Sequence, residues 1–407
     1  MIRDAFFLLC LLLPFCKALG QCDFSSIKYN IEVEEGVYYG SAESFDGEID
    51  SLFLDIYRPV GDDNSARPLI IWCFGGGFIG GQRQDFSNVC EEFARRGYVS
   101  VTIDYRLGYV SPNFFSTPFA YDNRELLRAA YRAMQDAKGA VRFMKNRHQK
   151  DKTDPEEVYI GGASAGAITA LATAFISEEE DIDTTFIRAL PATNTNPAVE
   201  RPDLGPVRGL LHLGQNDASV KGVVNIFGAV FDLDQVSAED DIAIYSYHQT
   251  EDPIVPCYKD KAYWGLPLIA INMPTGHGSC ALEEHLDAIS YEPDLFESWI
   301  YDGDQHAIHD PVAMFDEIIY FLEGQICDDL TSTSSAERRD LVAYPNPVED
   351  ILYLNKKVGR VRILDIYGRT IKHLNGPESH LDVVDLRPGI YFLLNERTGE
   401  KIIFTKL

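Results

Sequence analysis

Short apolar runs alternate with amphipathic stretches through most of the chain. Three of the apolar runs have the length and composition of strands that are buried on both faces: 68–74, 98–103 and the run around Val158. Residues 51–58 alternate apolar and polar positions, which predicts a half-buried strand. Further strands are predicted at 222–227, 242–247, 267–272 and 296–301, and helices at 88–96, 136–146, 167–176, 280–289 and 311–322. This alternation predicts an α/β fold, a mostly parallel sheet with helices on both faces.

The pattern changes near the C-terminus. Residues 328–340, "DDLTSTSSAERRD", are polar and rich in Ser and Thr, and we predict a flexible linker there. Short strand-like segments follow at 361–366, 371–374, 381–386 and 390–394, separated by turn residues. Residues 341–407 are therefore predicted to form a second, small all-β sandwich domain.

The N-terminus has the pattern of a targeting segment. Arg3 precedes an apolar run at 5–15, and Ala18-Leu19-Gly20 supplies small residues for cleavage. The run is shorter than the roughly 20 apolar residues of a membrane-spanning helix. A lipoprotein signal ending at Cys22 is disfavoured because Gln21 stands where a small residue is needed. We predict a signal peptide at 1–20 and no transmembrane segment in the mature chain.

The charge of the chain limits its partners. Asp and Glu total 63 against 36 Lys and Arg, a formal net charge of -27. Such a surface repels nucleic acid and anionic lipid, so neither is expected as a partner. From Asp340 onward there are 10 basic and 9 acidic residues. The acidity therefore belongs to the body, 21–327, and the two units have different surfaces.

Eight cysteines are present, and two of them lie in the predicted signal peptide. An exported chain that retains an even number is expected to form disulfides. Cys22 and Cys327 bracket the body, while Cys257 and Cys280 are close in sequence, so these pairings are hypotheses to test. Cys73 lies in an apolar strand, where a buried free thiol is the simpler interpretation.

A serine stands between small residues in "GGASAG", Gly161 to Gly166, where a predicted strand meets a predicted helix. The pattern G-x-S-x-G is that of a nucleophile elbow, with Ser164 exposed on a strained turn. A Gly-rich turn that packs a helix closely on a sheet is the alternative. Three glycines, Gly75 to Gly77, follow another strand and suit an oxyanion hole built from backbone N–H groups. A flexible turn is the alternative there.

A serine nucleophile needs a base, and the base needs an acid that orients it. His306 follows the last strand of the body and is the favoured base, whereas His309 is interpreted as a capping or surface residue. Asp252, in a turn bounded by prolines, is the favoured acid. Glu251 is the fallback, and His248 is interpreted as a residue that packs the loop.

The order Ser164, Asp252, His306 is that of α/β-hydrolases. The segments "DIYRP", "IWCFGGGFIGG", "VTIDYRLG", "GGASAG", "HQTEDPIVP" and "GDQHAIHD" make the body resemble an α/β-hydrolase of the carboxylesterase and hormone-sensitive-lipase-like esterase group. In the third of these segments, Asp104 and Arg106 are interpreted as a structural pair.

The resemblance implies roles for six residues. Ser164 would be the nucleophile, His306 the base and Asp252 the acid, and the oxyanion would be bound by the N–H groups of Gly76, Gly77 and Ala165. No cofactor or metal is implied. The acidic clusters at 178–181 and 239–241 lack the ligand spacing of a known calcium loop and are interpreted as solvated surface. The chain departs from many relatives at Phe74, where they have His.

The tail carries a second resemblance. "YPNPVEDILYL", "ILDIYGR", "LRPGIYFL" and "KIIFTKL" resemble the C-terminal sorting domain of type IX secretion. This implies export through the periplasm to the cell surface or the medium, with the type IX machinery as a partner. A carbohydrate-binding or adhesion module is the alternative.

Together these features predict a secreted serine carboxylic ester hydrolase that acts through an acyl-enzyme on a small-molecule or polymer-linked ester. A serine peptidase of the prolyl-peptidase type and a catalytically silent binding or adhesion protein on an esterase scaffold are the alternatives. The long loops 109–126 and 177–220 are candidates for a lid or an acyl-binding wall. Three residues of the first loop, Phe114, Phe115 and Phe119, are candidates to line an apolar pocket, and packing of an ordered loop is the alternative.

Overall fold

The computed structural model describes residues 22–61, 63–112, 118–177, 183–190, 201–214, 216–331, 341–358, 361–374, 378–395 and 401–407. The predicted signal peptide, most of the predicted linker, the acidic cluster 178–181, Phe114 and Phe115 lie outside these residues. Phe119 is described and is half-buried.

An eight-stranded sheet in the order β1-β2-β4-β3-β5-β6-β8-β11 forms the centre of the body. The strands from β4 to β11 run parallel, and β2 is antiparallel to both of its neighbours. Every residue of β3 and β4 is buried, as expected for central strands covered on both faces. The bounds are β1 Asn30–Glu43, β2 Ile49–Val60, β3 Arg67–Cys73, β4 Val99–Ile103, β5 Thr153–Ala163, β6 Gly222–Ile226, β8 Ala243–Gln249 and β11 Phe296–Tyr301.

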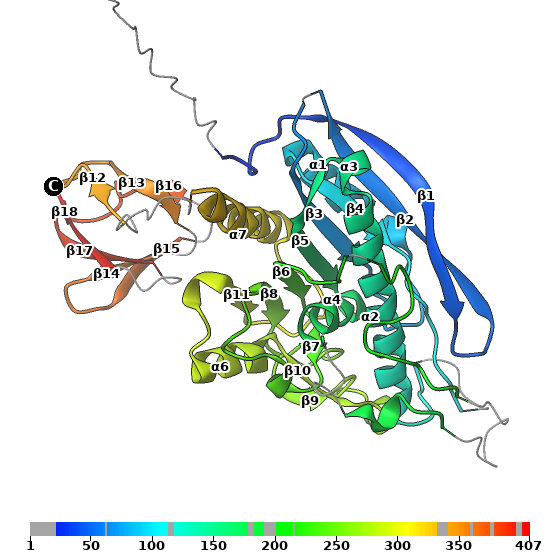
Figure 1. Ribbon diagram of the computed structural model, residues 1–407. Coiled ribbons are helices and arrows are strands. Elements are labelled where there is room, and N and C mark those ends of the chain that lie inside the picture. The colour runs from blue at the N-terminus through cyan, green and yellow to red at the C-terminus, as the bar shows by residue number, and fades with distance from the viewer. Residues whose placement is uncertain are drawn as a thin grey trace, which may run out of the picture.

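Helices cover both faces of this sheet. The chain steps in one direction from β3 to β4 and in the other from β4 to β5, so right-handed crossovers put α1 and α2 on opposite faces. Figure 1 shows α2 beside α4 in front of the sheet, and α1 contacts α7 through Phe93 and Phe315. The helices are α1 Ser87–Arg96, α2 Asn123–Asn146, α3 His148–Asp151, α4 Ala165–Phe175, α5 Pro267–Ala270, α6 Ser279–Ile289 and α7 Pro311–Thr331.

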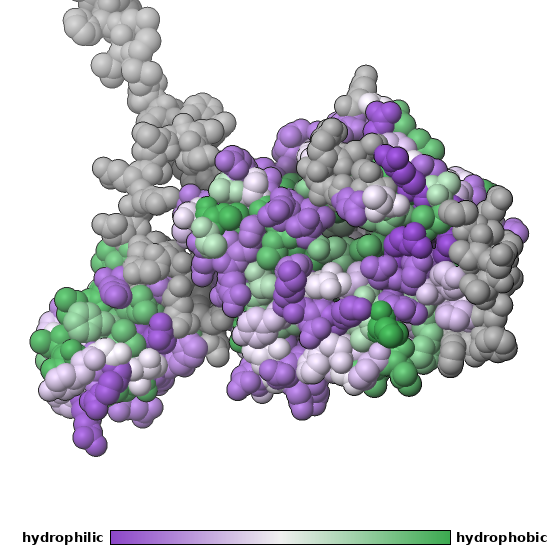
Figure 2. All heavy atoms as spheres, turned by 90° about the horizontal axis from the view of Figure 1, so that it is seen from below, coloured by the Kyte–Doolittle hydropathy of each residue, from purple (hydrophilic) through white to green (hydrophobic). Residues whose placement is uncertain are grey.

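Smaller elements complete the body. A three-stranded sheet in the order β7-β10-β9 is formed by Ala229–Val230, Thr275–Gly278 and Lys259–Lys261. Short 3-10 helices span Arg83–Phe86, Thr184–Phe186, Leu233–Gln235 and Pro293–Leu295. On the face drawn in Figure 2, polar residues are interspersed with apolar ones. Within the described residues, no helix has both the length and the apolar content that crossing a bilayer requires.

The tail forms two antiparallel sheets with a hydrophobic core of their own (Figure 1). One sheet has the order β12-β13-β16 and the other β15-β14-β17-β18. The predictions of an α/β body and of a small all-β domain are thus confirmed. The strands are β12 Ala343–Tyr344, β13 Ile351–Val358, β14 Val361–Asp365, β15 Thr370–Leu374, β16 Glu378–Asp382, β17 Gly389–Asn395 and β18 Lys401–Lys406.

Several sequence-based expectations differ from the structure. The strand predicted at 267–272 is wrong: the segment begins with the short helix α5, with a proline at its first turn and Leu268 84% exposed. The predicted loop 109–126 ends early, because Asp122 accepts a hydrogen bond from the Arg124 N–H and caps α2. Helix α7 continues to Thr331, four residues into the range predicted as linker.

Asp104 and Arg106 do not pair with each other, so the expected pairing is wrong, although each makes a structural contact with another residue. Arg106 points to Asp136 on α2, with 2.8 Å between Nη2 and Oδ1. Asp104 instead accepts a hydrogen bond of 2.9 Å from Arg83. Both residues come just after the end of β4, where the chain turns away from the sheet. Their side chains therefore point in different directions.

Two disulfides are formed, one between cysteines far apart in sequence and one between cysteines 23 residues apart. Cys22 bonds to Cys327 and Cys257 bonds to Cys280, which confirms both hypothetical pairings. The first connects the N-terminal segment to α7, and the second connects the loop after β8 to the second residue of α6. Cys73 and Cys90 are buried free thiols, and burial raises the pKa of each.

We expect the exported chain, unfolded without reductant, to expose two reactive thiols, those of Cys73 and Cys90. In the native chain neither should react, because both are buried and their raised pKa keeps them protonated. Thiol titration with an aromatic disulfide reagent, before and after guanidinium, measures this. The Cys73→Ala, Cys90→Ala double variant is the control and should give none. Reaction of all the described cysteines without reductant would show that the disulfides do not form.

Candidate active site

Ser164 stands on a strained turn between β5 and α4. Its φ of 55° and ψ of -122° are rarely adopted by a residue with a side chain. The turn is fixed because the Ser164 N–H donates to the Ile226 carbonyl, at 2.9 Å, and the Ser164 carbonyl accepts from Ile168, at 3.0 Å. The serine side chain therefore projects at the carboxyl end of β5, beside β6.

Gly162 and Gly166 permit this turn. A Cβ on Gly162 would lie 2.4 Å from the carbonyl carbon of Gly166, and one on Gly166 would lie 2.1 Å from the carbonyl oxygen of Cys73. Both distances are too short for real atoms. The glycines of "GGASAG" are thus required by the close approach of α4 to β3 and β5, as the elbow pattern predicts.

His306 lies between the serine and an aspartate. Its Nε2 is 2.8 Å from Ser164 Oγ, and its Nδ1 is 2.6 Å from Asp252 Oδ2. It follows β11, and its ring packs on Phe227 with 4.6 Å between ring centroids. The structure thus brings together the predicted nucleophile, base and acid.

Gln249, at the end of β8, holds the histidine loop on both sides of His306. Its side-chain oxygen accepts from the Gln305 N–H at 2.9 Å, and its amide nitrogen donates to the Ala307 carbonyl at 2.7 Å. A Cβ on Gly303 would lie 2.2 Å from the same oxygen, so a side chain there would displace the Gln249 amide. Sequence reasoning did not single out Gln249. Its only signal is its position at a strand end, within the segment that carries the acid.

Asp252 is 1% exposed and its carboxylate is fully engaged. Oδ1 accepts from the N–H groups of Ile254, at 2.8 Å, and Val255, at 3.1 Å, while Oδ2 faces His306. Burial by itself would raise the pKa of Asp252. Hydrogen bonds from His248 and His306 and the charges of both rings outweigh it, so the pKa is lowered. The carboxylate is therefore ionised when it faces His306.

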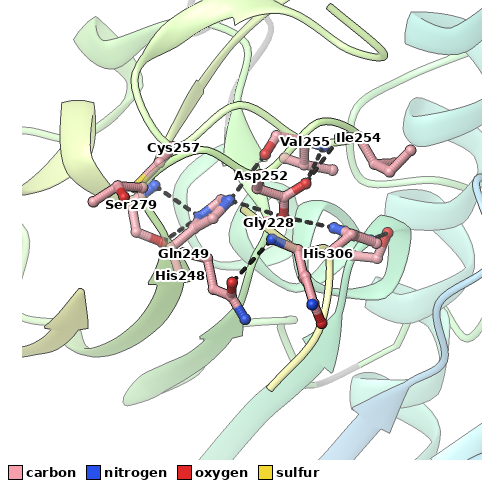
Figure 3. Close-up of polar contacts among 12 residues, drawn as sticks. Gly228, His248, Gln249, Asp252, Ile254, Val255, Cys257, Ser279 and His306 are labelled. Atoms are coloured by element: carbon pink, nitrogen blue, oxygen red, sulfur yellow. Dashed lines mark hydrogen bonds and ion pairs between the residues drawn. The ribbon is translucent and has the colours of Figure 1, made fainter. Parts of the chain in front are cut away.

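His248 lies on the other side of this carboxylate, with its Nε2 at 3.5 Å from Oδ2 (Figure 3). It is fully buried, donates from Nε2 to the Val255 carbonyl and accepts the Ser279 N–H at Nδ1. It therefore packs the loop, as interpreted from the sequence, and also contacts the acid.

The two alternative residues lie apart from this arrangement. Glu251 is exposed and does not take the position of the acid, while its N–H donates to the Gly303 carbonyl. His309 is exposed and stacks on Tyr301 with 3.6 Å between centroids, and its Nδ1 is 3.0 Å from the Tyr247 hydroxyl.

The three-glycine loop packs against the serine turn. A Cβ on Gly75 would lie 3.4 Å from Ser164 Cβ and 2.9 Å from the Ala163 carbonyl oxygen. Gly76 and Gly77 have φ values of 128° and 62°, which favour glycine. Phe74 is buried and stacks on Tyr105, whose hydroxyl donates to the Phe74 carbonyl at 2.6 Å. This contact orients the start of the loop.

Ala165 is the first residue of α4, where N–H groups have no acceptor within the helix. It follows the serine directly in the chain. The roles of Gly76, Gly77 and Ala165 stay predictions. Among the described residues, no group of three or more His, Cys, Asp or Glu side chains is arranged to hold a metal.

Two family models match the chain. Residues 54–201 match BD-FAE, and residues 342–407 match the secretion system C-terminal sorting domain. The body thus has the α/β-hydrolase fold, and the tail matches a C-terminal sorting domain. Both predicted resemblances are thereby confirmed, and the tail directs this α/β-hydrolase to the cell surface or the medium.

Gut esterase 1 of Caenorhabditis briggsae is 34% identical over 128 residues, which cover 30% of this chain and 21% of the relative. Fumonisin B1 esterase of Sphingopyxis macrogoltabida is 30% identical over 118 residues, covering 29% and 22%. The α/β-hydrolase thus spans about a fifth of the length of these curated relatives. A solved carbohydrate esterase from gut microbiota, in truncated form, is 16% identical with a TM-score of 0.46, covering 74% of this chain and 98% of that one.

Replacing Asp252 by Asn should destabilise the α/β-hydrolase at neutral pH and much less in acid. A carboxylate whose folded pKa is lowered stabilises the fold above its unfolded pKa, about 3.9, and this contribution is lost as the pH falls through the folded value. Denaturant unfolding of both proteins from pH 7 to pH 3 should therefore give a stability difference that is constant above about pH 4 and begins to shrink below it, toward the lowered folded pKa.

Glu251→Gln is the matched control, because this neighbouring carboxylate is exposed and should contribute little at any pH. A stability difference between Asp252→Asn and the wild type that stays constant across this range would contradict the assignment of an ionised, hydrogen-bonded Asp252.

Proposed function

We propose that the protein hydrolyses carboxylic esters through Ser164 and a covalent acyl-enzyme. The observation that carries this proposal is the continuous contact from Ser164 Oγ through His306 to Asp252, at 2.8 Å and 2.6 Å. Distances of this size allow a proton to pass from the serine to the imidazole. The esterases among the relatives support the same reaction class.

In the first half-reaction, Ser164 Oγ attacks the ester carbonyl carbon while its proton passes to Nε2 of His306. The tetrahedral intermediate then collapses, the bond to the alcohol oxygen breaks, and His306 gives that oxygen its proton. In the second half-reaction, His306 takes a proton from water, and the hydroxide attacks the acyl carbon. Return of the proton to Ser164 releases the acid.

Asp252 has two tasks in this scheme. By accepting from Nδ1–H it keeps Nε2 free to act as the base, and its negative charge stabilises the imidazolium that forms. The N–H donors from Ile254 and Val255 hold Oδ1, so Oδ2 remains directed at His306. Gln249 acts as a positioning residue for the loop that carries the base.

The negative charge that develops on the carbonyl oxygen needs its own donors. We assign this role to the N–H groups of Gly76, Gly77 and Ala165. Support comes from the packing of the glycine loop against the serine turn and from the position of Ala165 at the start of α4. Removal of one such donor typically lowers kcat by about 10²–10³-fold.

We further propose the division of the chain into a signal peptide at 1–20, a catalytic body that begins at residue 21 and ends with α7 at Thr331, a linker from there to residue 340, and a sorting domain at 341–407. The type IX secretion machinery would read the last of these. N-terminal sequencing of the exported protein tests cleavage after Gly20. An exported hydrolase meets polymers outside the cell, and we propose a polymer-linked ester as the substrate class, with release of a small acid from the polymer as the test.

Ser164→Ala and His306→Ala should each lower kcat/KM on an aryl acetate by about 10⁴-fold or more, because nucleophile and base act as one unit. Spectrophotometric release of the phenol measures this. A series of aryl esters with longer acyl chains then reports the depth of the acyl pocket.

His309→Ala is the matched control, since this histidine lies three residues from His306 but stacks on Tyr301 instead of facing the serine. It should retain most of the wild-type kcat/KM. If a folded wild-type protein turned over none of these esters, or if Ser164→Ala were as active as the wild type, the proposed reaction would be wrong.

A further inference from the structure

A cavity with charged residues in its lining lies apart from the candidate active site. Its volume is about 240 Å³, and it is bounded by α2, by the segment that ends β1 and by residues 201–211. Ser164, Asp252, His306 and the glycine loop do not line it. Four arginines do: Arg106, Arg128, Arg132 and Arg201.

Two of these arginines are neutralised by buried carboxylates. Arg106 pairs with Asp136, with Nη2 to Oδ1 at 2.8 Å, and its Nε also donates to that carboxylate. Arg201 pairs with Glu125. Each of these pairs carries no net charge, so neither would attract a further ion by itself.

Arg128 and Arg132 have no such partner. Each is 2% exposed, and among the described residues neither has a carboxylate within ion-pair distance. Arg128 donates only to main-chain carbonyls, those of Phe186, Arg188 and Pro202. Two buried positive charges therefore face the cavity without a directly paired carboxylate. Only more distant carboxylates, Glu125 and Asp136 among them, offset these charges, so an anion in the cavity would stabilise them.

One donor of Arg132 also lacks a hydrogen-bond acceptor among the described residues. Its Nη2 donates to the Gly108 carbonyl at 2.6 Å, but its Nε is buried with no partner within the described residues. The same holds for the Nε of Arg201. A guanidinium has five N–H donors, and a buried donor without an acceptor costs roughly 1–3 kcal/mol. Both side chains line the cavity, although these two Nε atoms are themselves closed to solvent.

Two further carboxylates line the cavity but do not cancel this charge. The side chains of Glu43 and Asp203 are exposed, so water and salt screen them. Asp203 also accepts the N–H of Gly205 at 2.8 Å. Burial, together with the positive charges of Arg106 and Arg128, lowers the pKa of Arg132 to about 9. The buried part of the cavity is therefore positive.

We propose that this cavity binds a small dianionic oxyanion, with Arg132 and Arg128 as its principal cationic groups. A tetrahedral oxyanion such as phosphate or sulfate supplies the two negative charges and the acceptor oxygens that the arginines lack. The planar fork of a guanidinium matches such oxygens. The site goes beyond ester hydrolysis, because it shares no lining residue with the candidate active site.

Calorimetric titration of the full chain with inorganic phosphate, with sulfate and with acetate, at constant ionic strength set by chloride, tests the proposal. We expect saturable binding of one phosphate or sulfate per chain, weaker binding of acetate and a rise in Tm with phosphate. Arg132→Met should weaken phosphate binding by about tenfold to a hundredfold, the effect of losing a charged hydrogen-bond donor.

Arg142→Met is the matched control. Arg142 lies on the same helix, is equally buried and donates to the carbonyls of Leu211 and Arg208, but it does not line the cavity. This variant should lose stability and keep phosphate binding. Absence of saturable phosphate or sulfate binding to the wild type would overturn the proposal whether or not the variants fold. Unchanged phosphate binding by a folded Arg132→Met would overturn it as well.

Discussion

The close approach of α4 to β3 and β5 is the constraint on which the candidate active site depends. It leaves no room for a side chain at Gly162 or Gly166, since a Cβ at either would overlap main-chain atoms. The same tight turn puts Ser164 in a conformation that costs of order 1–3 kcal/mol. Packing of the buried sheet offsets this conformational free energy. The turn in return holds the Ser164 side chain in one orientation. The glycine loop after β3 packs on that turn, so the geometry around the serine follows from one contact between a helix and two strands.

The carboxyl ends of neighbouring parallel strands then bring the other groups to the serine. Asp252 follows β8 and His306 follows β11, and these strands pair in register. Gln249, the last residue of β8, bonds to both sides of His306, so the strand that precedes the acid also holds the base. The disulfide between Cys257 and Cys280 ties the acid loop to α6, where Ser279 contacts His248 behind the carboxylate. Each of these contacts restricts the orientation of one ring or one carboxylate.

The parts predicted from sequence are those with a local cause. The elbow follows from glycines two positions on either side of Ser164, the central strands from short apolar runs, and the acid and base from turns at strand ends. The partner of Arg106 could not be predicted, because Asp136 lies 30 residues away and side-chain direction after a strand is set by tertiary packing. The apolar run at 267–272 has the composition of a strand, yet Leu268 is exposed and the segment begins with α5. The contacts of Gln249 and the unpaired arginines likewise exist only once distant segments have met. The catalytic roles of Ser164, Asp252 and His306 remain predictions, whereas their proximity is observed.

The central claim is that Ser164 is a nucleophile activated by His306. Covalent labelling with a fluorophosphonate, followed by mass spectrometry of the digested protein, tests it most directly, because this reagent modifies serines that a neighbouring base activates. We predict a single adduct on the peptide that contains Ser164, formed at a rate that Asp252→Asn greatly reduces. An adduct on another residue, or no adduct on a protein that hydrolyses esters, would contradict the account.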